Sequence, residues 1–249
     1  MERIAVLSDV HGNLTAYEAV LADIDARGIT RVINLGDQIG KGPRGSACVA
    51  LTQQRCEATV QVNWEASLTD GQQLSPLAEW ARDDVTPDQL AWLGALPFCH
   101  DLELGGRRIR LLHASATSVF TRVSDNHTWE QFHGMFAATG ATGPGPLPDV
   151  VGCGGIHGTY LQGDENRTLF NVGSVGNPLD ATTASYAVLE GIVDSTAAAP
   201  FGIQFVHVPY DIEAEIAAAT DLGMPELDEY AVELREGIYR GVHRTRQPS

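Results

Sequence analysis

Short apolar runs alternate with helical patterns through the first part of the chain. The runs at residues 3–8 and 31–35 are mostly apolar, as is typical of buried strands. Between them, residues 13–28 place apolar side chains on one helical face and end in a glycine. A second helical stretch and a third apolar run follow at residues 48–62. Strands that alternate with helices in this way predict a wound α/β unit with parallel strand pairing.

The pattern becomes helical between about residues 66 and 98, where two segments each start at a proline. We interpret this stretch as a helical insertion within a single domain that spans residues 1–249. Strand patterns resume at residues 101–115, where the Gly105-Gly106 pair predicts a hairpin turn. The rest of the chain is predicted to contain, in order, a helix at 126–138, a Gly/Pro loop at 139–148, short strands at 150–151, 168–172, 185–189 and 203–208, and two amphipathic helices at 211–238.

Five of the apolar runs lead into residues that can bind a metal ion. These segments read IAVLSDVH, VINLGD, ATVQVN, IRLLH and VVGCGGIH. Ligands of α/β sheets gather beyond the carboxyl ends of the strands, so these side chains are expected to converge. Any one of them alone has an ordinary explanation as a turn residue or a hydrogen-bonded histidine, but the joint pattern favours a metal site. The predicted ligands are Asp9, His11, Asp37, Asn63, His113 and His157.

The order of these elements resembles the calcineurin-like metallophosphoesterase superfamily. Its pattern is D-x-H, then G-D-x-x-G, then an asparagine followed by an acid, then a histidine and a G-x-H element. Residues 171–191, NVGSVGNPLDATTASYAVLEG, are similar to a block of the small bacterial phosphodiesterase branch of that superfamily. The resemblance implies an α/β fold of the α+β type, a four-layer sandwich of two mixed β-sheets flanked by helices.

The resemblance also implies how two metal ions share the ligands, with Asp37 bridging them. The implied ligands are Asp9, His11, Asp37 and His157 for the first ion, and Asp37, Asn63 and His113 for the second. Carboxylate and imidazole groups suit manganese, iron, zinc or nickel, so one or two divalent ions per chain are expected. The implied activity is hydrolysis of a small phosphodiester or phosphomonoester by attack of a metal-bound hydroxide.

Three residues depart from the family pattern. Val62 stands where the family has a glycine, which allows a backbone shape that a β-branched residue resists. The other two departures affect the chemistry directly. Trp64 occupies the position of the family's catalytic histidine, which follows the asparagine. Gly155 occupies the position of the first histidine in the family's G-H-x-H element. The resemblance places the catalytic positions at Asp37, Asn63 and Trp64, but an indole cannot release a proton near neutral pH. Esters with good leaving groups are therefore expected to be the better substrates. The second metal, which lacks one ligand, is expected to bind weakly.

These departures keep two other functions open. A catalytically weakened member would act as a regulatory protein or sensor that binds a phosphorylated metabolite or a partner protein. The retention of six candidate ligands in order argues against this reading. The other alternative is a structural metal protein, which would unfold when its metal is removed.

Three polar residues near the predicted ligands are candidates for binding the substrate. Lys41 and Arg44 follow Asp37 in a loop, where Lys41 either contacts a phosphate or points into solvent. Asn13 would reach a phosphate oxygen or cap the helix that follows it. The block at residues 171–178 is expected to shape the backbone near the site.

Composition and charge restrict the partners that the protein can have. The formal net charge is −16, from 32 acidic and 16 basic residues, and there is no run of basic residues. A duplex-binding protein normally has a basic face, so a small phosphorylated substrate is expected and long nucleic acid is not. The first residues show no leader pattern, and the 4 cysteines lack metal or redox spacing. We therefore expect a cytoplasmic protein with free thiols and no membrane association, while the oligomeric state stays open.

Overall fold

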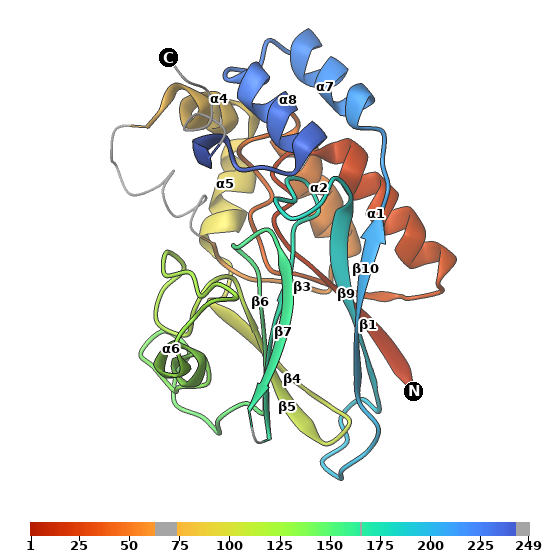
Figure 1. The fold of residues 1–249 in the computed structure, drawn as a ribbon, viewed down its shortest axis with the longest axis vertical. Helices are drawn as coiled ribbons and strands as arrows, with labels where there is room; N and C mark the ends of the chain where they lie inside the picture. Colours follow the sequence, from red (N-terminus) through yellow and green to blue (C-terminus); the bar gives the residue numbers. More distant parts are fainter. Residues whose placement is uncertain (63–73, 165, 243–249) are drawn as a thin grey trace.

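Two five-stranded sheets packed against each other form the centre of the protein (Figure 1). The computed structural model describes residues 1–62, 74–164 and 166–242. The first sheet has the order β10-β9-β1-β2-β3 and the second the order β4-β5-β6-β8-β7. The strands of the first sheet are β1 (Glu2–Leu7), β2 (Arg31–Asn34), β3 (Ala58–Thr59), β9 (Ala184–Gly191) and β10 (Gly202–Val208). Those of the second are β4 (Cys99–Leu104), β5 (Arg107–Leu112), β6 (Val150–Cys153), β7 (Thr159–Asp164) and β8 (Arg167–Val172).

Both sheets combine parallel and antiparallel pairs. In the first sheet β1, β2 and β3 are parallel, as the alternation of strands and helices predicted, and β9 runs antiparallel to β1 and β10. In the second sheet β5, β6 and β8 are parallel, and the edge strands β4 and β7 are antiparallel to their neighbours. The predicted pair of mixed sheets is therefore confirmed.

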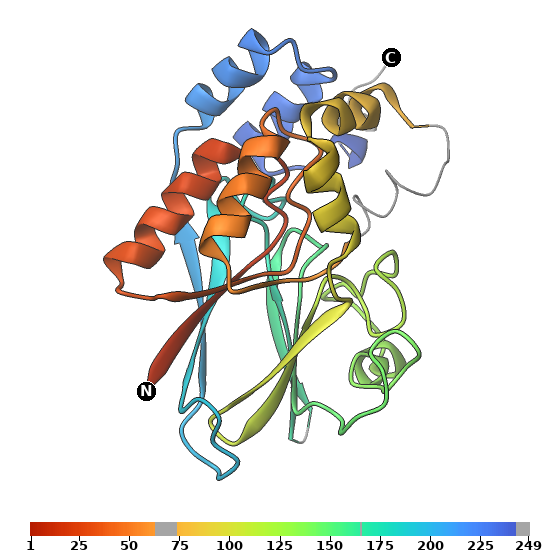
Figure 2. The ribbon, with the colours of Figure 1, turned by 180° about the vertical axis from the view of Figure 1, so that it is seen from behind.

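Helices cover the outer faces of the sheet pair (Figure 2). The helices are α1 (Leu14–Ala26), α2 (Gly45–Arg55), α4 (Pro76–Asp84), α5 (Pro87–Gly94), α6 (Trp129–Gly134), α7 (Ile212–Asp221) and α8 (Leu227–Glu236). α1 packs on the first sheet and α6 on the second, whereas α4, α5, α7 and α8 lie toward one end of the molecule (Figure 1). No helix in the described part of the chain has the length and apolar character needed to span a membrane.

The central strand β1 shows how the layers are held together. Ala5 and Leu7 belong to the core cluster under α1, whereas Ile4 and Val6 belong to the cluster between the two sheets, which also contains Phe170 of β8. Successive side chains of a strand point to opposite faces, so one apolar strand contributes to two cores. This arrangement produces the predicted four-layer sandwich.

The helix and hairpin predictions are confirmed, with different bounds, where the structure describes the chain. Residues 66–73 of the predicted insertion lie outside the described residues. α4 and α5 lie in the predicted helical insertion, and each starts at a proline that follows a capping side chain, Ser75 or Thr86. The β4–β5 hairpin turns at Gly105 and Gly106, which both have positive φ. The helix predicted at residues 126–138 is confined to α6. Strand β7 was missed because its sequence, TYLQGD, contains no apolar run.

Candidate metal centre

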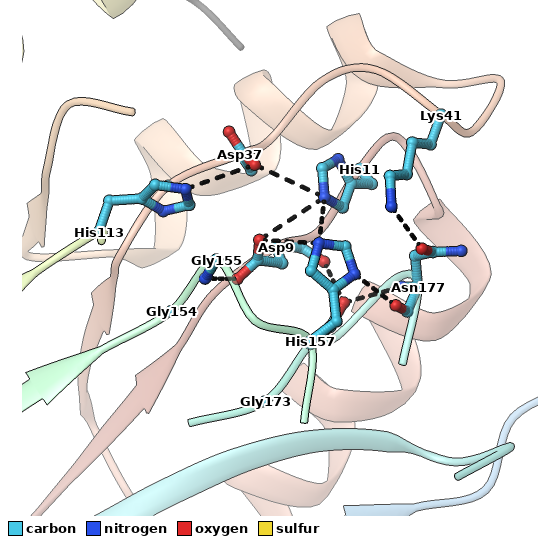
Figure 3. Close-up of polar contacts among 12 residues, drawn as sticks. Asp9, His11, Asp37, Lys41, His113, Gly154, Gly155, His157, Gly173 and Asn177 are labelled. Carbon is cyan, nitrogen blue, oxygen red and sulfur yellow. Dashed lines mark hydrogen bonds and ion pairs between the residues drawn. The ribbon is translucent and has the colours of Figure 1, made fainter. Parts of the chain in front are cut away.

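Five of the six predicted ligands meet at the carboxyl ends of strands from both sheets (Figure 3). Asp9 and His11 follow β1, Asp37 follows β2, His113 follows β5, and His157 lies in the loop after β6. None of these residues is more than 4 % exposed. The convergence that the strand ends predicted is therefore present in the structure.

The remaining predicted ligand, Asn63, and the predicted catalytic position Trp64 lie outside the described residues. Their assignments rest on the sequence alone and stay predictions.

Asp9, His11 and His157 form the first group of candidate ligands. Oδ1 of Asp9 lies 3.6 Å from Nε2 of His11 and 3.3 Å from Nε2 of His157. The two imidazole nitrogens lie 3.2 Å from each other. Three donor atoms gathered so closely face a common point, as the ligands of one cation do.

Asp9, Asp37 and His113 form the second group. Oδ2 of Asp37 lies 3.5 Å from Nε2 of His113 and 3.6 Å from Nε2 of His11. Asp37 thus lies between the histidines of the two groups, where the family resemblance puts the bridging carboxylate. Asp9 is the residue that belongs to both groups of described side chains, whereas the family resemblance implied it for the first metal only.

Backbone carbonyls orient all three histidines in the same way. Each ring places Nδ1 near a carbonyl oxygen: Leu35 for His113 at 2.9 Å, Ile39 for His11 at 3.3 Å and Asn177 for His157 at 2.6 Å. A carbonyl can only accept, so Nδ1 carries a proton in each ring, and Nε2 faces the centre. This pattern is common among histidines that bind metals.

The two carboxylates lack the donors that buried anions require. Oδ1 of Asp9 and both carboxylate oxygens of Asp37 are buried without a hydrogen-bond partner among the described residues. Only Oδ2 of Asp9 has one, the backbone N–H of Gly155 at 2.9 Å. Uncompensated buried anions are costly, so these oxygens fit a cation.

The protonation states of Asp9 and His11 suit metal binding. Burial raises the pKa of Asp9, but the facing His157 and His11 outweigh that effect and hold the pKa well below its usual range. Burial lowers the pKa of His11 to about 4. At neutral pH the site therefore presents an ionised carboxylate and a neutral imidazole, the forms that bind divalent transition metals.

Backbone strain is concentrated around the same residues. Five of the seven non-glycine residues with positive φ in the described ranges lie here: Asp9, His11, Asp37, Lys41 and His157, with φ between 51° and 66°. This conformation costs roughly 1–2 kcal/mol for a residue with a Cβ atom. Strain of this kind is typical of functional sites, where the surrounding structure holds the backbone in place.

Comparison with known proteins identifies the family. Residues 2–192 match the family model of the calcineurin-like phosphoesterase superfamily domain. The chain belongs to this superfamily. An uncharacterised protein of Methanocaldococcus jannaschii is similar to this chain, with 27 % identity over 237 residues that cover 90 % of this chain and 94 % of that one.

Solved structures show the same fold over almost the whole chain. A metallophosphoesterase from Sphaerobacter thermophilus superposes with a TM-score of 0.75 at 23 % identity, covering 95 % of this chain and 99 % of its own. A hypothetical protein from Pyrococcus horikoshii superposes with a TM-score of 0.75 at 14 % identity, covering 96 % and 100 %. At these identities the likeness establishes the fold of the chain, including its sandwich of two mixed sheets.

Gly155 leaves a position beside the second ligand group without a side chain. A Cβ atom added to Gly155 would lie 3.3 Å from Nε2 of His113, so a side chain at this position would point into the centre. The family histidine that Gly155 replaces would therefore reach the second group. This geometry supports the prediction that the second metal is bound more weakly than the first.

We expect the substitution Gly155→His to tighten binding of the second metal. After dialysis the wild-type protein should hold about one ion per chain, whereas the variant should approach two, as metal analysis would measure. Gly155 has φ +72°, so the new side chain should destabilise the fold by roughly 1–2 kcal/mol. Gly163→His on β7 is the control, and two tightly held ions in the wild type would contradict the prediction.

Two of the three candidate substrate residues have other partners. Oδ1 of Asn13 accepts the Ala16 N–H at 2.9 Å, and its Nδ2 donates to the Gly176 carbonyl at 2.8 Å. These bonds support the alternative that Asn13 caps α1. The guanidinium of Arg44 pairs with the buried carboxylate of Glu215 in α7. Arg44 thus joins its loop to the C-terminal helices.

Lys41 is the candidate substrate residue that remains beside the centre (Figure 3). Its Nζ donates to Oδ1 of Asn177 at 2.7 Å. Burial lowers the pKa of Lys41 to about 8, although Glu233 opposes the shift. The ammonium form still predominates at neutral pH, and it carries a positive charge next to the carboxylates.

The block at residues 171–178 holds the loop after β1 in place. The Ser174 hydroxyl and the Gly176 N–H both donate to the carbonyl of Asp9, at 2.7 and 2.9 Å. Asn171 donates to the Gly154 carbonyl at 2.7 Å. These contacts support the expected backbone role, whereas the contacts of the Asn177 side chain with Lys41 and Glu233 were not predictable from the sequence pattern.

Proposed function

We propose that this protein hydrolyses a small phosphomonoester or phosphodiester with the help of one or two divalent metal ions. Its membership of the superfamily supports a metal-dependent phosphoesterase. The observation that carries the proposal is the buried cluster in which carboxylate oxygens without donors face oriented imidazole nitrogens. A purely structural polar core would pair such oxygens with N–H or O–H groups.

The residues in and beside the cluster would have two roles, binding cations and binding the substrate. Divalent cations at such a site supply a nucleophilic hydroxide at neutral pH and stabilise charge on the phosphoryl oxygens. Asp9, His11 and His157 would hold one cation, and Asp9, Asp37 and His113 a second. The ammonium of Lys41 would bind a phosphoryl oxygen, as a point charge does. The burial of the ligands strengthens these electrostatic interactions because bulk water is excluded.

We expect the rate of hydrolysis to depend strongly on the leaving group. Trp64 stands where the family has its catalytic histidine, so no proton is donated from that position. A positioned acid typically contributes about 10²–10⁴-fold, and alkyl esters should lose most of that relative to aryl esters and phosphoanhydrides. Rates measured over a series of aryl and alkyl phosphates would test this. The variant Trp64→His should reduce the difference in rate between aryl and alkyl esters. Equal rates for both ester classes in the wild type would contradict the prediction.

Two of the departures from the family pattern also support a second candidate function. With Trp64 and Gly155 in place, the protein would bind a phosphorylated metabolite or a regulatory partner without turnover. Hydrolysis of bis(p-nitrophenyl) phosphate and p-nitrophenyl phosphate by metal-stripped protein, titrated with manganese, nickel, zinc and magnesium, separates the two functions. Metal-dependent turnover establishes the phosphoesterase, and the ratio of rates indicates diester or monoester. Metal binding without turnover favours the second function.

Chelation distinguishes either function from a structural metal protein. The apolar clusters under α1 and between the sheets are formed by residues outside the ligand groups. Chelated protein should therefore keep its circular dichroism spectrum and lose only activity. Unfolding on chelation would support the structural alternative.

A further inference from the structure

The C-terminal helices contact the loop that carries Lys41, although they lie beyond the residues matched by the family model. The buried carboxylate of Glu215 in α7 pairs with Arg44 of the loop. Tyr230 of α8 packs against Gly42, where an added Cβ atom would lie 2.7 Å from the tyrosine hydroxyl. The loop is therefore held from the side of α7 and α8.

Glu233 of α8 is a fully buried carboxylate that reaches the same loop through Asn177. It accepts hydrogen bonds from Nδ2 of Asn177 at 3.1 Å, from Nε and Nη2 of Arg240 at 2.9 and 3.0 Å, and from the backbone N–H of Arg240 at 3.0 Å. The guanidinium of Arg240 compensates the negative charge of Glu233, and the Asn177 amide donates to one of its remaining lone pairs. A buried carboxylate with four donors is strongly fixed in position.

These neighbours determine the orientation of the Asn177 amide. An ammonium can only donate and a carboxylate can only accept, so Oδ1 must face Lys41 and Nδ2 must face Glu233. The backbone of Asn177 is fixed as well, because its carbonyl accepts from His157 and its N–H donates to Ser174 at 2.9 Å (Figure 3). Asn177 therefore links the C-terminal helix to both Lys41 and a candidate ligand.

We infer that Glu233 is a positioning residue for substrate binding. It fixes the amide of Asn177, and that amide holds the ammonium of Lys41 beside the centre, where it can meet an anionic oxygen of the substrate. If the Glu233 charge is removed, the amide can rotate, and Lys41 then loses its acceptor. The inference rests on the proposed function, since the anion that Lys41 binds is the phosphate of the substrate.

The test is the near-isosteric variant Glu233→Gln, which keeps the shape but removes the charge and one acceptor. We expect KM and the inhibition constant of inorganic phosphate to rise about tenfold, the effect of losing one charge-assisted hydrogen bond. The kcat value should change by less than about twofold, and the metal content should stay the same. Glu213→Gln, in the exposed pair of α7 and α8 between Glu213 and Arg235, is the matched control.

A double-mutant cycle shows whether Glu233 acts through Lys41. Lys41→Met should raise the phosphate inhibition constant at least as much as Glu233→Gln, and the double variant should match Lys41→Met alone. The same effect of Glu233→Gln in both backgrounds, or no effect in the wild type, would overturn the inference. Should Glu233→Gln not fold, Asn177→Ser provides the same comparison, because it keeps the backbone bonds to His157 and Ser174.

Failure of the inference can be told apart from failure of the proposed function. Calorimetric titration of the metal-loaded variants with inorganic phosphate measures the role of Lys41 without turnover. Absence of hydrolysis with the expected loss of phosphate affinity would count against the enzyme and support the positioning role. Normal hydrolysis with unchanged phosphate affinity in Glu233→Gln would support the enzyme and count against the positioning role.

Discussion

Asp37→Asn should abolish metal-dependent hydrolysis, with a loss larger than the roughly 10–100-fold that follows removal of an outer-shell partner of a metal. Asp37 lies between His11 and His113 and has both carboxylate oxygens buried without a hydrogen-bond partner among the described residues. Asparagine keeps the shape of the side chain but offers the cations only a neutral oxygen. The second metal should be lost first, because Asp37 is one of the three described side chains in its ligand group.

The same substitution should stabilise the protein when no metal is present. The uncompensated carboxylate of Asp37 destabilises the metal-free fold, and an amide can donate a hydrogen bond to a neutral imidazole. We expect the free energy of unfolding of chelated protein to rise by about 1–3 kcal/mol. For a chain of this size that corresponds to roughly 2–4 °C in Tm for each kcal/mol.

Both effects are measured on one preparation. Metal analysis and hydrolysis assays give the functional loss, and thermal unfolding in chelator gives the gain in stability. Asp221→Asn, an exposed position at the end of α7, should change neither. A metal-free Asp37→Asn protein less stable than the wild type would show that the carboxylate stabilises the fold in a way that does not involve a cation.

Gly176→Ala should destabilise the protein by about 3 kcal/mol, at the upper end of the range for overpacking. A Cβ atom at Gly176 would lie 1.7 Å from the carbonyl oxygen of Val10 and 2.9 Å from Cβ of Asn13. Neither neighbour is the far end of a flexible side chain, so the backbone must shift. The displaced segment carries Asp9 and His11, and metal affinity should therefore fall together with stability.

Chemical denaturation with and without metal, together with metal analysis, would measure both effects. Gly94→Ala, at the end of α5, is the matched control because no atom lies within 4 Å of its added Cβ. It should be neutral or stabilise the protein by a few tenths of a kcal/mol to about 1 kcal/mol. Unchanged metal binding in Gly176→Ala would show that the loop after β1 does not depend on this turn.

Local sequence patterns predicted the strands that carry the site. The runs that became β1 and β2 are apolar on both faces, because these strands are covered on one side by helices and on the other by the second sheet. β7 could not be found in this way, since Leu161 is exposed and the strand lies at a sheet edge. Edge strands carry a weaker apolar signal because they contribute less to the core.

The candidate ligands at the strand ends could also be predicted from the sequence. Asp9 and His11 stand directly after an apolar run, and parallel strands bring their carboxyl ends together whatever the details of packing. The sequence did not predict that the two ligand groups share Asp9. It depends on how closely the loop after β1 approaches His113 of the other sheet, and the packing of the sheets determines that approach.

The sequence by itself thus determined the family, most of the strands and the convergence of five candidate ligands. The tertiary structure alone decided that Asn13 caps α1, that Arg44 pairs with Glu215 of α7, and that Lys41 lies beside the centre. It also brought Glu233 to Asn177, 56 positions away along the chain. The physical reason is that a strand and the loop after it are encoded by neighbouring residues, whereas the partner of a buried polar group depends on which helix packs over it.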